Sequence, residues 1–524
     1  MACSSCFYMF IHFLFLYLSS QPIGVHNLYL SMKPLCLEDE KSALLQFKER
    51  YDIAKTLSWK ISQDCCSWEG IECDENTGHV IVLNLGSSSL YGSIDNNSTL
   101  FQLTHLEKLI LSDNHFYSQI PSRVGDLSRL THLDLSASVY SGQVPTEIFK
   151  LTRLVYLNLC CNPSLYDPYH YNFINLLEMK ALGLRSLVQN MTSLEELHLG
   201  FVNMSSQVPN TLANLSSLRS LDMDWCDLHG EFPSAIFHLP KLRYLGVGDN
   251  SALTGRLPNF NSSSPLEELR LQATSFSGEL PSSIGILPSL SYLDVTQCKF
   301  SGSIPASLAN LSNLKDLSVS ANPFTTLSIS SISWVWKKKK LTNLALEMIN
   351  LYGEIPPSIG NLSQLHKLSL NDNQLSSAIP SQLMNLTQLT ILDLGRNQLS
   401  GSIPSWLMNM TQLVELDLAV NKFQGEIPSS ISQLQNLMFL RLFENNFNGT
   451  IELDNFHKYR QLQVLQLSYN RLSGCTSSAN LILPRLLALG LASCKSYSSS
   501  TFSLRTRFMQ FKRVSSILTK PRGY

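Results

Sequence analysis

The sequence predicts an α/β-type repeat solenoid, in which short units stack into a curved array with a parallel β-sheet on its concave face. The first observation is a recurring phrase, L-x-x-L-x-L, with 17 copies; twelve of the sixteen intervals between copies equal 24 residues. The second is a group of four cysteines between residues 36 and 73, just before the first copy. An array needs such a cap because its first unit would otherwise expose core and an unpaired strand edge. The copies start at residues 80, 106, 130, 154, 194, 218, 242, 266, 290, 314, 341, 365, 389, 413, 437, 462 and 486.

Each unit has the pattern of a leucine-rich repeat, whose signature is this phrase at a period of 20 to 29 residues. In the unit that starts at Leu290, side chains alternate along the expected strand. Leu293 and Val295 are expected to point into the array, while Tyr292 and Asp294 point out from the concave face. The outward positions have no role in the core, so a binding surface is expected there.

A column of asparagines lies five residues after the strand leucine of many units. A buried amide has two donors and an acceptor, so stacked amides can satisfy backbone groups where the chain turns out of the strand. Cys226, Cys298 and Cys494 occupy the same column and are expected to be internal weak donors rather than ligands or catalytic thiols. The asparagines are Asn114, Asn162, Asn250, Asn322, Asn373, Asn397, Asn421, Asn445 and Asn470.

Segments rich in glycine and proline, such as 399–404 (LSGSIP), follow this column. Glycine permits a tight turn and proline ends a short extended segment, so the convex side is expected to be extended and irregular rather than fully helical. Two intervals are longer than 24 residues. From 154 to 194, residues 163–180 are expected to loop out, and the unit from 314 to 341 is extended. We expect the lysine run at residues 337–340 in that unit to be a solvated edge.

The remaining features limit the domain organisation and the possible functions. Lys and Arg number 39 against 40 Asp and Glu, which leaves no basic field for nucleic acid or an anionic membrane.

The uncharged run 7–18 predicts a signal peptide over residues 1–24, followed by the cap at 25–79 and the repeats at 80–494. No other stretch approaches the roughly 18 apolar residues of a membrane helix. Residues 495–524 hold seven basic residues and no acidic ones, and we expect this non-repeat tail to be a disordered end left by truncation or altered splicing.

The cap and the repeat phrase together resemble the extracellular region of plant leucine-rich-repeat receptor-like proteins and receptor kinases. The resemblance covers about residues 36–494. It rests on the segments 36–48 (CLEDEKSALLQFK), 58–59 (SW) and 64–73 (DCCSWEGIEC), and on the plant-type phrase L-x-G-x-I-P. It implies disulfides between Cys36 and Cys65 and between Cys66 and Cys73, although spacing alone allows three connectivities. Of the twelve cysteines, only this group looks like a disulfide framework.

The resemblance also implies a function, namely extracellular recognition of a peptide or protein ligand in plant defence or development, with co-receptor kinases as partners. It places the chain at the extracellular face of the plasma membrane. The family's usual C-terminal cysteine cap and membrane helix are missing from this sequence, so a secreted product is the alternative. A second hypothesis is a secreted inhibitor of a cell-wall-degrading enzyme, similar to polygalacturonase-inhibiting proteins. Such inhibitors have roughly ten units closed at both ends, and the 17 starts counted here favour the receptor class.

The sequence contains no phosphate-binding loop, kinase phrase, zinc-protease motif or nucleophile elbow, so we expect no enzyme, no cofactor and no metal. The best ligand contacts are unusual outward side chains in the middle of the array, where six carboxylates alternate with aromatic residues. Strands lie about 4.8 Å apart, so five units present a track on the order of 20 Å, suited to an extended peptide with basic or polar groups. The alternative is a merely solvated polar face. The candidates are Glu196, His198, Asp222, Asp224, Trp225, Tyr244, Asp249, Glu268, Arg270, Tyr292 and Asp294.

The glycosylation sequon N-x-[ST] occurs at eleven asparagines, six of them four residues before a repeat start. That position lies outside the inward strand, so glycans there would hydrate the convex side or flank and leave the concave track open. The alternative is that six sequons share this position simply because the repeat consensus places an asparagine there. The six are Asn190, Asn214, Asn310, Asn361, Asn385 and Asn409, and the others are Asn96, Asn97, Asn203, Asn261 and Asn448.

Overall fold

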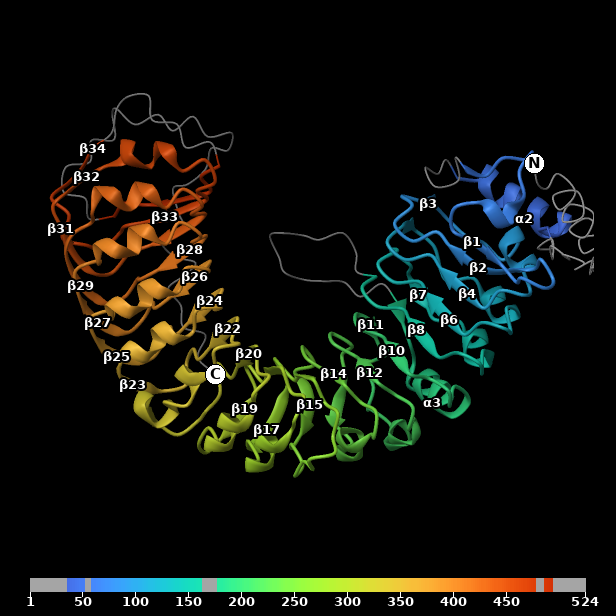
Figure 1. Cartoon of the computed structure of the whole chain (residues 1–524), viewed down its shortest axis with the longest axis horizontal. Coiled ribbons are helices and arrows are strands. Elements are labelled where there is room, and N and C mark those ends of the chain that lie inside the picture. Colours follow the sequence, from blue (N-terminus) through green and yellow to red (C-terminus); the bar gives the residue numbers. More distant parts are fainter. Residues whose placement is uncertain (1–34, 52–57, 163–176, 477–484, 493–524) are drawn as a thin grey trace, which may run out of the picture.

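The computed structural model describes residues 35–51, 58–162, 177–476 and 485–492. Over these residues the chain forms a curved solenoid shaped like an open horseshoe (Figure 1). The expected signal peptide, the tail 495–524, Cys494 and residues 163–176 of the expected loop-out lie outside the described residues. Within the described part, no helix combines the length and the apolar character that a membrane span requires.

A sheet of 18 strands lines the inner side of the curve. Neighbouring units pair in parallel, as where Leu221 lies opposite Leu245 and Leu245 opposite Leu269. Among the described strands of this sheet, β1 alone is antiparallel to its neighbour, β2. The predicted solenoid with a concave parallel sheet is therefore confirmed. The strands are β1 (Ile71–Cys73), β2 (Val80–Asn84), β4 (Lys108–Ile110), β6 (His132–Asp134), β8 (Tyr156–Asn158), β10 (Glu196–His198), β12 (Ser220–Asp222), β14 (Tyr244–Gly246), β16 (Glu268–Arg270), β18 (Tyr292–Asp294), β20 (Asp316–Ser318), β22 (Asn343–Ala345), β24 (Lys367–Ser369), β26 (Ile391–Asp393), β28 (Glu415–Asp417), β30 (Phe439–Arg441), β33 (Val464–Gln466) and β35 (Ala488–Gly490).

Shorter parallel sheets follow the turn out of most concave strands, and Figure 1 shows β23, β25, β27, β29 and β31 on the outer side of the curve. Their strands are β3 (Tyr91–Gly92) and β5 (His115–Phe116); β7 (Gly142–Gln143), β9 (Leu177–Glu178) and β11 (Val202–Asn203); β13 (His229–Glu231), β15 (Ala252–Gly255), β17 (Ser275–Glu279) and β19 (Lys299–Ser301); β21 (Leu327–Ser328), β23 (Leu351–Glu354), β25 (Gln374–Ser377), β27 (Gln398–Gly401), β29 (Lys422–Glu426) and β31 (Asn446–Asn448); and β32 (Thr450–Glu452) and β34 (Gly474–Thr476).

The convex side carries short 3₁₀ helices, a regularity that the sequence pattern did not predict. Most begin directly after the proline of the repeat phrase, as η9 does after Pro305, an N-cap residue in extended conformation with φ −68° and ψ 130°. The helices are η3 (Thr99–Gln102), η4 (Ser122–Asp126), η5 (Thr146–Lys150), η6 (Asn210–Asn214), η7 (Ser234–His238), η8 (Ser282–Ile286), η9 (Ala306–Asn310), η10 (Ile329–Ile332), η11 (Val335–Lys337), η12 (Pro357–Asn361), η13 (Ser381–Asn385), η14 (Ser405–Asn409), η15 (Ser429–Gln433) and η16 (Leu453–Lys458).

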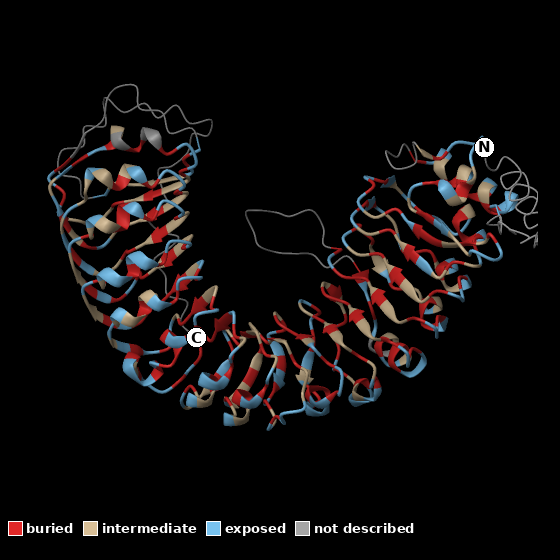
Figure 2. Cartoon of the chain, in the orientation of Figure 1, coloured by how far each residue is buried: buried red, intermediate tan, exposed pale blue. Residues whose placement is uncertain are grey.

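The core between the two sides is a continuous stack of leucines, and the buried positions alternate along the concave strands (Figure 2). Leu293 and Val295 are fully buried, while Tyr292 and Asp294 are half-buried on the concave surface. The predicted alternation is therefore confirmed. Full burial of one such leucine stabilises the fold by about 1.5–3 kcal/mol.

The asparagine column forms a hydrogen-bonded ladder in the interior. Asn114, 1% exposed, donates from Nδ2 to the carbonyl oxygens of Leu111 (2.9 Å) and of Leu85 in the preceding unit (2.9 Å). Its Oδ1 accepts the N–H of Leu90, also in the preceding unit (2.9 Å). Each amide thus closes the turn of the unit before it. The same inter-unit donation is made by Asn162, Asn250, Asn322, Asn373, Asn397, Asn421, Asn445 and Asn470.

Cysteine, serine and threonine residues fill several of the remaining places in this column, while the apolar residues Val202 and Ile349 fill two others. The Sγ of Cys226 donates to the Leu199 carbonyl (3.1 Å), and that of Cys298 donates to the Leu271 carbonyl (3.0 Å). Burial raises the pKa of both thiols, that of Cys298 to about 11, so both stay protonated and unreactive. Their expected role as internal donors is confirmed.

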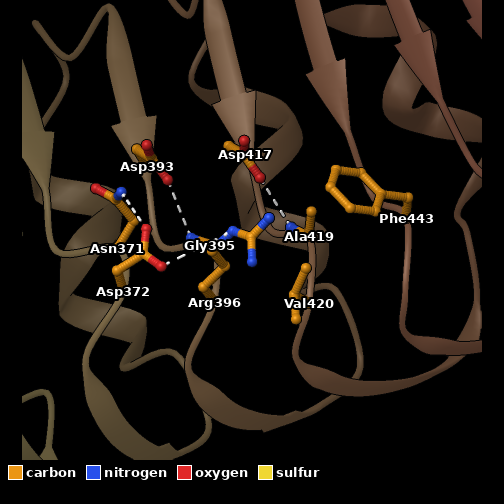
Figure 3. A pocket seen from close by; sticks show the side chains of 9 residues that line it. All are labelled: Asn371, Asp372, Asp393, Gly395, Arg396, Asp417, Ala419, Val420 and Phe443. Carbon is orange, nitrogen blue, oxygen red and sulfur yellow. Dashed lines mark hydrogen bonds and ion pairs between the residues drawn. The ribbon is translucent and has the colours of Figure 1, made fainter. Parts of the chain in front are cut away.

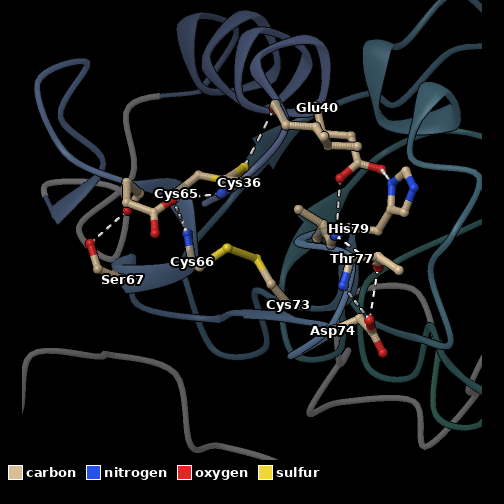
Figure 4. Close-up of a disulfide and its surroundings, with 12 residues drawn as sticks. Cys36, Glu40, Cys65, Cys66, Ser67, Cys73, Asp74, Thr77 and His79 are labelled. Carbon is tan, nitrogen blue, oxygen red and sulfur yellow. Dashed lines mark hydrogen bonds and ion pairs between the residues drawn. A yellow bond between two sulfur atoms is a disulfide. The ribbon is translucent and has the colours of Figure 1, made fainter. Parts of the chain in front are cut away.

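The N-terminal cap covers the first unit with helix α2 (Glu38–Glu49), which buries Ala43, Leu44 and Phe47. Its acidic first turn and basic last turn complement the helix dipole. A short 3₁₀ helix, η2 (Cys65–Ser67), precedes β1. Disulfides join Cys36 to Cys65 and Cys66 to Cys73, the pairing implied by the family resemblance (Figure 4).

The first long interval departs from expectation in two respects. Residues 177–178, expected within the loop-out, instead form β9 and pair in parallel with β7 and β11. The unit then continues with α3 (Ala181–Asn190), a full α-helix where an irregular segment was expected. This segment, ALGLRSLVQN, lacks the proline that starts most of the 3₁₀ helices and is rich in strong helix formers.

Lys338 contradicts the expectation of a solvated lysine edge. Its side chain is 9% exposed, and Nζ donates to the carbonyls of Ala309 (2.5 Å) and Leu311 (2.7 Å) at the end of η9. Burial lowers the pKa of this ammonium group. The C-terminal carbonyls of a helix have no partner inside it, which explains why a lysine is drawn in. Lys337, Lys339 and Lys340 are exposed, as expected.

A third disulfide joins the adjacent residues Cys160 and Cys161 at the end of β8. A disulfide framework was expected between Cys36 and Cys73 alone, and that expectation is wrong. The spacing patterns that identify disulfide frameworks do not cover neighbouring cysteines. The bond packs beside Gly200 of the next unit, where an added Cβ atom would lie 3.2 Å from the Cys160 sulfur.

Candidate functional site

Eight of the eleven predicted ligand contacts lie in two rows across the consecutive strands β10, β12, β14, β16 and β18. All eight are half-buried, so each presents part of its side chain on the concave face. One row contains Glu196, Tyr244, Glu268 and Tyr292, and the other contains His198, Asp222, Arg270 and Asp294.

Arg270 occupies the centre of these rows, between two aromatic rings. Its guanidinium carbon lies 4.3 Å from the ring centroid of Tyr292 and 5.4 Å from that of Tyr244. It also donates to a carboxylate oxygen of Glu268 (3.1 Å). A partly desolvated cation–π contact contributes about 0.5–2 kcal/mol. These contacts therefore hold the flat, cationic guanidinium group of Arg270 in place.

Asp222 and Asp224 form a carboxylate pair beside this cation. Burial, and then the neighbouring charge of Asp222, raise the pKa of Asp224 to about 7, although its carboxylate accepts the Gly248 N–H (2.5 Å). Burial also raises the pKa of Asp222. A ligand cation placed here would favour the charged form of both groups, so the pair is suited to an ammonium or guanidinium group.

Asp224, Trp225 and Asp249 were predicted at outward strand positions, but they lie in the turns that follow β12 and β14. Trp225 and Asp249 have a positive φ, 57° and 56°, which places them at the tight turn out of the strand. Trp225 stacks on Phe201 of the preceding unit, with centroids 5.8 Å apart and ring planes 7° apart. The tryptophan therefore extends the candidate surface to the rim of the sheet, with 37% of its area exposed.

A hollow further along the concave face was missed in the sequence (Figure 3). It has a volume of about 250 Å³, part of it open to solvent, and lies where Gly395 and Ala419 leave the surface without bulky side chains. Asp393 accepts the Gly395 N–H (3.0 Å), Asp417 accepts the Ala419 N–H (2.9 Å), and Phe443 forms one wall.

The charge of this hollow is mainly negative. Burial, and then the charge of Asp417, raise the pKa of Asp393 to about 7. Arg441 pairs with Glu415 and reaches Asp417 at 3.4 Å. The sequence feature that could have indicated this hollow is the phrase L-D-L followed by glycine or alanine in two successive units, at residues 392–395 and 416–419. The predicted ligand contacts end at Asp294, before these units begin.

The predicted sequon asparagines are exposed, apart from Asn203, which is half-buried. Five of the six in the shared position end 3₁₀ helices of the convex side, and Asn190 ends α3. Glycans attached there would point away from the concave face. Glycosylation itself stays a prediction.

Family models match four parts of the chain. The leucine-rich repeat N-terminal domain matches residues 37–74, a leucine-rich repeat region matches 78–238, and leucine-rich repeats match 289–311 and 363–423. These matches agree with the cap and the array described above.

Curated plant proteins are similar over parts of the array. Receptor-like protein 7 of Arabidopsis thaliana is 45% identical over 245 residues, covering 46% of this chain and 25% of that protein. Receptor-like protein Cf-9 of Solanum pimpinellifolium is 38% identical over 205 residues, covering 35% of this chain and 22% of that protein. The matched region thus spans a quarter or less of each of these relatives.

Solved receptor ectodomains share the fold. The ectodomain of the Arabidopsis thaliana receptor kinase GASSHO1/SCHENGEN3, in complex with CASPARIAN STRIP INTEGRITY FACTOR 2, is 28% identical, has a TM-score of 0.58, and covers 82% of this chain and 59% of its own. The ectodomain of the Arabidopsis receptor kinase HAESA, in complex with an IDA peptide hormone, is 26% identical with a TM-score of 0.58, covering 87% and 85%. A TDR receptor is 28% identical with a TM-score of 0.59, covering 78% and 73%. The chain is therefore a leucine-rich-repeat protein with a leucine-rich repeat N-terminal domain, homologous to plant receptor-like proteins.

Proposed function

We propose that the chain is the non-catalytic ligand-recognition part of a receptor-like protein, that it acts at the extracellular face of the plasma membrane, and that it binds an extended peptide along its concave sheet. Bound ligand would then recruit membrane receptor kinases in plant defence or development. The observation that carries the proposal is the pair of outward rows on β10 to β18. They place charged and aromatic side chains at regular spacing on a surface with no role in the core.

The spacing of the strands suits an extended ligand. Five strands about 4.8 Å apart give a track on the order of 20 Å, which an extended peptide of about six residues would cover. From β12 to β28 there are eight strand spacings, or about 38 Å, so a peptide of about twelve residues would reach both Asp222 and Asp417.

The chemistry of the surface favours a ligand with both cationic and flat groups. The pairs Asp222–Asp224 and Asp393–Asp417 are half-buried carboxylates whose pKa values are raised, so a ligand ammonium or guanidinium group would relieve the cost of ionising them. The exposed face of Trp225 offers an aromatic anchor of the kind that often dominates binding energy.

The comparisons support this choice of ligand class. The GASSHO1/SCHENGEN3 structure holds CASPARIAN STRIP INTEGRITY FACTOR 2, and the HAESA structure holds a peptide hormone. Another HAESA structure, of lower similarity to this chain, is a complex with the co-receptor SERK1. The proposal that a co-receptor kinase is a partner of this chain rests on the family relationship.

The test is a binding experiment on the secreted, full-length chain. A peptide display library with random extended sequences is selected against it, and affinities of the enriched peptides are measured by calorimetry. Substitution of Asp222, Trp225 and Tyr292 together by alanine should weaken binding at least about tenfold without reducing secretion. The matched control replaces the exposed convex residues Gln189, Gln382 and Gln433 by alanine and should leave affinity unchanged.

Enriched peptides that bind both variants equally well would refute this placement. Peptides whose binding survives the first substitution but is lost in Asp393→Asn with Asp417→Asn would move the site to the second hollow. If no peptide is enriched, the ligand class is wrong.

A further inference from the structure

Three side chains with metal-binding chemistry converge where the cap meets the first two repeats. Glu40 comes from α2, His79 directly precedes β2, and His105 lies three residues before β4. Their nearest donor atoms, one carboxylate oxygen and two imidazole nitrogens, all lie within 4.8 Å of one another. The concave ligand surface and the repeat ladder do not involve this cluster.

Glu40 is held in a fixed position by the first repeat. Its side chain is buried, and Oε2 accepts the Val80 N–H at 2.7 Å. Oε1 lies 3.0 Å from Nδ1 of His79 and 3.7 Å from Nδ1 of His105 (Figure 4 shows the first contact). A single carboxylate oxygen thus faces both imidazole nitrogens.

The two imidazole rings stack, with centroids 3.4 Å apart and planes 13° apart. In this stack both Nδ1 atoms are directed toward the same carboxylate. About a quarter of each side chain remains exposed, 27% for His79 and 26% for His105, so the outer side of the cluster is open to water.

We infer that Glu40, His79 and His105 form a binding site for one divalent transition-metal ion, with Zn²⁺ as the best fit. Two imidazole nitrogens and one carboxylate oxygen are a known three-ligand set for zinc, with water in the fourth position. Nitrogen donors disfavour Ca²⁺ and Mg²⁺, which take oxygen ligands. Tetrahedral bonds of about 2.0–2.2 Å keep donor atoms roughly 3.3–3.6 Å apart. The 3.0 Å separation between Glu40 and His79 must therefore open slightly, and the longer separations, which are all within 4.8 Å, must close.

Binding requires one ring to turn out of the stack, because an ion must lie near the plane of each imidazole that binds it. His105 has the longer distance to the carboxylate, 3.7 Å, and its side chain is 26% exposed, so we expect this ring to be the one that turns. The bound ion would join helix α2 to the segments that precede β2 and β4. It would therefore fasten the cap to the first two repeats.

The experiment uses the full-length secreted chain with a purification tag that contains no histidine. The disulfides are kept oxidised, because the four cap cysteines would themselves hold zinc if they were reduced. Calorimetric titration with ZnCl₂ should give one ion per chain, MgCl₂ should give none, and CoCl₂ should produce the visible absorption of a tetrahedral site. Zinc should also raise the melting temperature.

The variants His105→Gln and Glu40→Gln should each weaken zinc binding by at least about 100-fold. Glutamine at position 40 keeps an acceptor for the Val80 N–H, which guards against simple misfolding. The matched control His366→Gln changes an exposed histidine outside the cluster and should bind zinc as the unchanged chain does. Absence of one-to-one uptake by the unchanged chain would overturn the inference, as would equal zinc affinity in the chain and both variants.

Discussion

Replacing Asn250 by alanine tests whether the interior asparagine ladder holds the repeats together. Asn250 is 1% exposed; its Nδ2 donates to the carbonyl of Met223 in the preceding unit (2.9 Å). Its Oδ1 accepts the N–H groups of Cys226 (3.0 Å) and Leu228 (2.9 Å), both also in the preceding unit. Alanine leaves these two N–H groups buried without a partner.

The expected destabilisation follows from those two groups. A buried N–H without a partner costs about 1–3 kcal/mol, so Asn250→Ala should lower the free energy of unfolding by about 2–6 kcal/mol. Asn250→Thr should cost less, because Thr274 sits in the same column and keeps a bond to the Leu271 carbonyl (2.7 Å). The control Asn436→Ala removes an exposed amide that makes one bond to a backbone carbonyl, and should change stability by about 0.5 kcal/mol or less.

Urea unfolding of the full-length chain, followed by circular dichroism, measures the overall effect. Hydrogen exchange adds a local readout, because the amides of Cys226 and Leu228 should exchange faster in Asn250→Ala while distant units keep their protection. If Asn250→Ala proves as stable as Asn436→Ala, with unchanged exchange at these two amides, the ladder does not have the role assigned to it.

Three further results are expected. Lys338→Met should lower stability by about 1–3 kcal/mol in thermal melts, because two carbonyls at the end of η9 lose their donor, whereas the exposed control Lys339→Met should be neutral. Asp224 has a pKa of about 7 in the folded chain, so stability should fall as pH rises from about 4 to 7, where the folded state holds a proton that the unfolded state has released. The variant Asp224→Asn should therefore have the same melting temperature as the unchanged chain near pH 4 and a higher melting temperature at pH 8. Equal melting temperatures at pH 8 would contradict the raised pKa of Asp224. Glycosidase treatment of protein from a eukaryotic secretory host should lower its mass, and an unchanged mass would argue against both the glycans and the signal peptide.

The repeat architecture could be predicted because the same physical problem is solved in every unit. The alternation of Leu293 with Asp294 and the position of Asn114 recur at a fixed period, so the period identified the strand, its inward face and the interior hydrogen bonds. The cap was recognised in the same way, from residues that occur together in related proteins.

Features that occur once along the chain could not be read from the period. Lys338 is buried because two carbonyls of the preceding unit lie within its reach, and the hollow at Asp393 exists because small residues meet on adjacent strands. The cluster of Glu40 and His79 joins residues 39 positions apart. Each depends on contacts between units or between cap and array, and the residues involved follow no repeating pattern.

The direction of the ladder has a consequence for synthesis on the ribosome. Asn114 completes the turn that contains Leu90, and Asn250 completes the turn that contains Cys226, so the closing amide is translated about one unit after the turn it closes. At about 5–20 residues per second, a 24-residue unit takes roughly 1–5 s to emerge. A nascent array would therefore carry one incomplete turn at its growing end at any moment. The growing end is therefore the part of the nascent array that still lacks its closing hydrogen bonds during export.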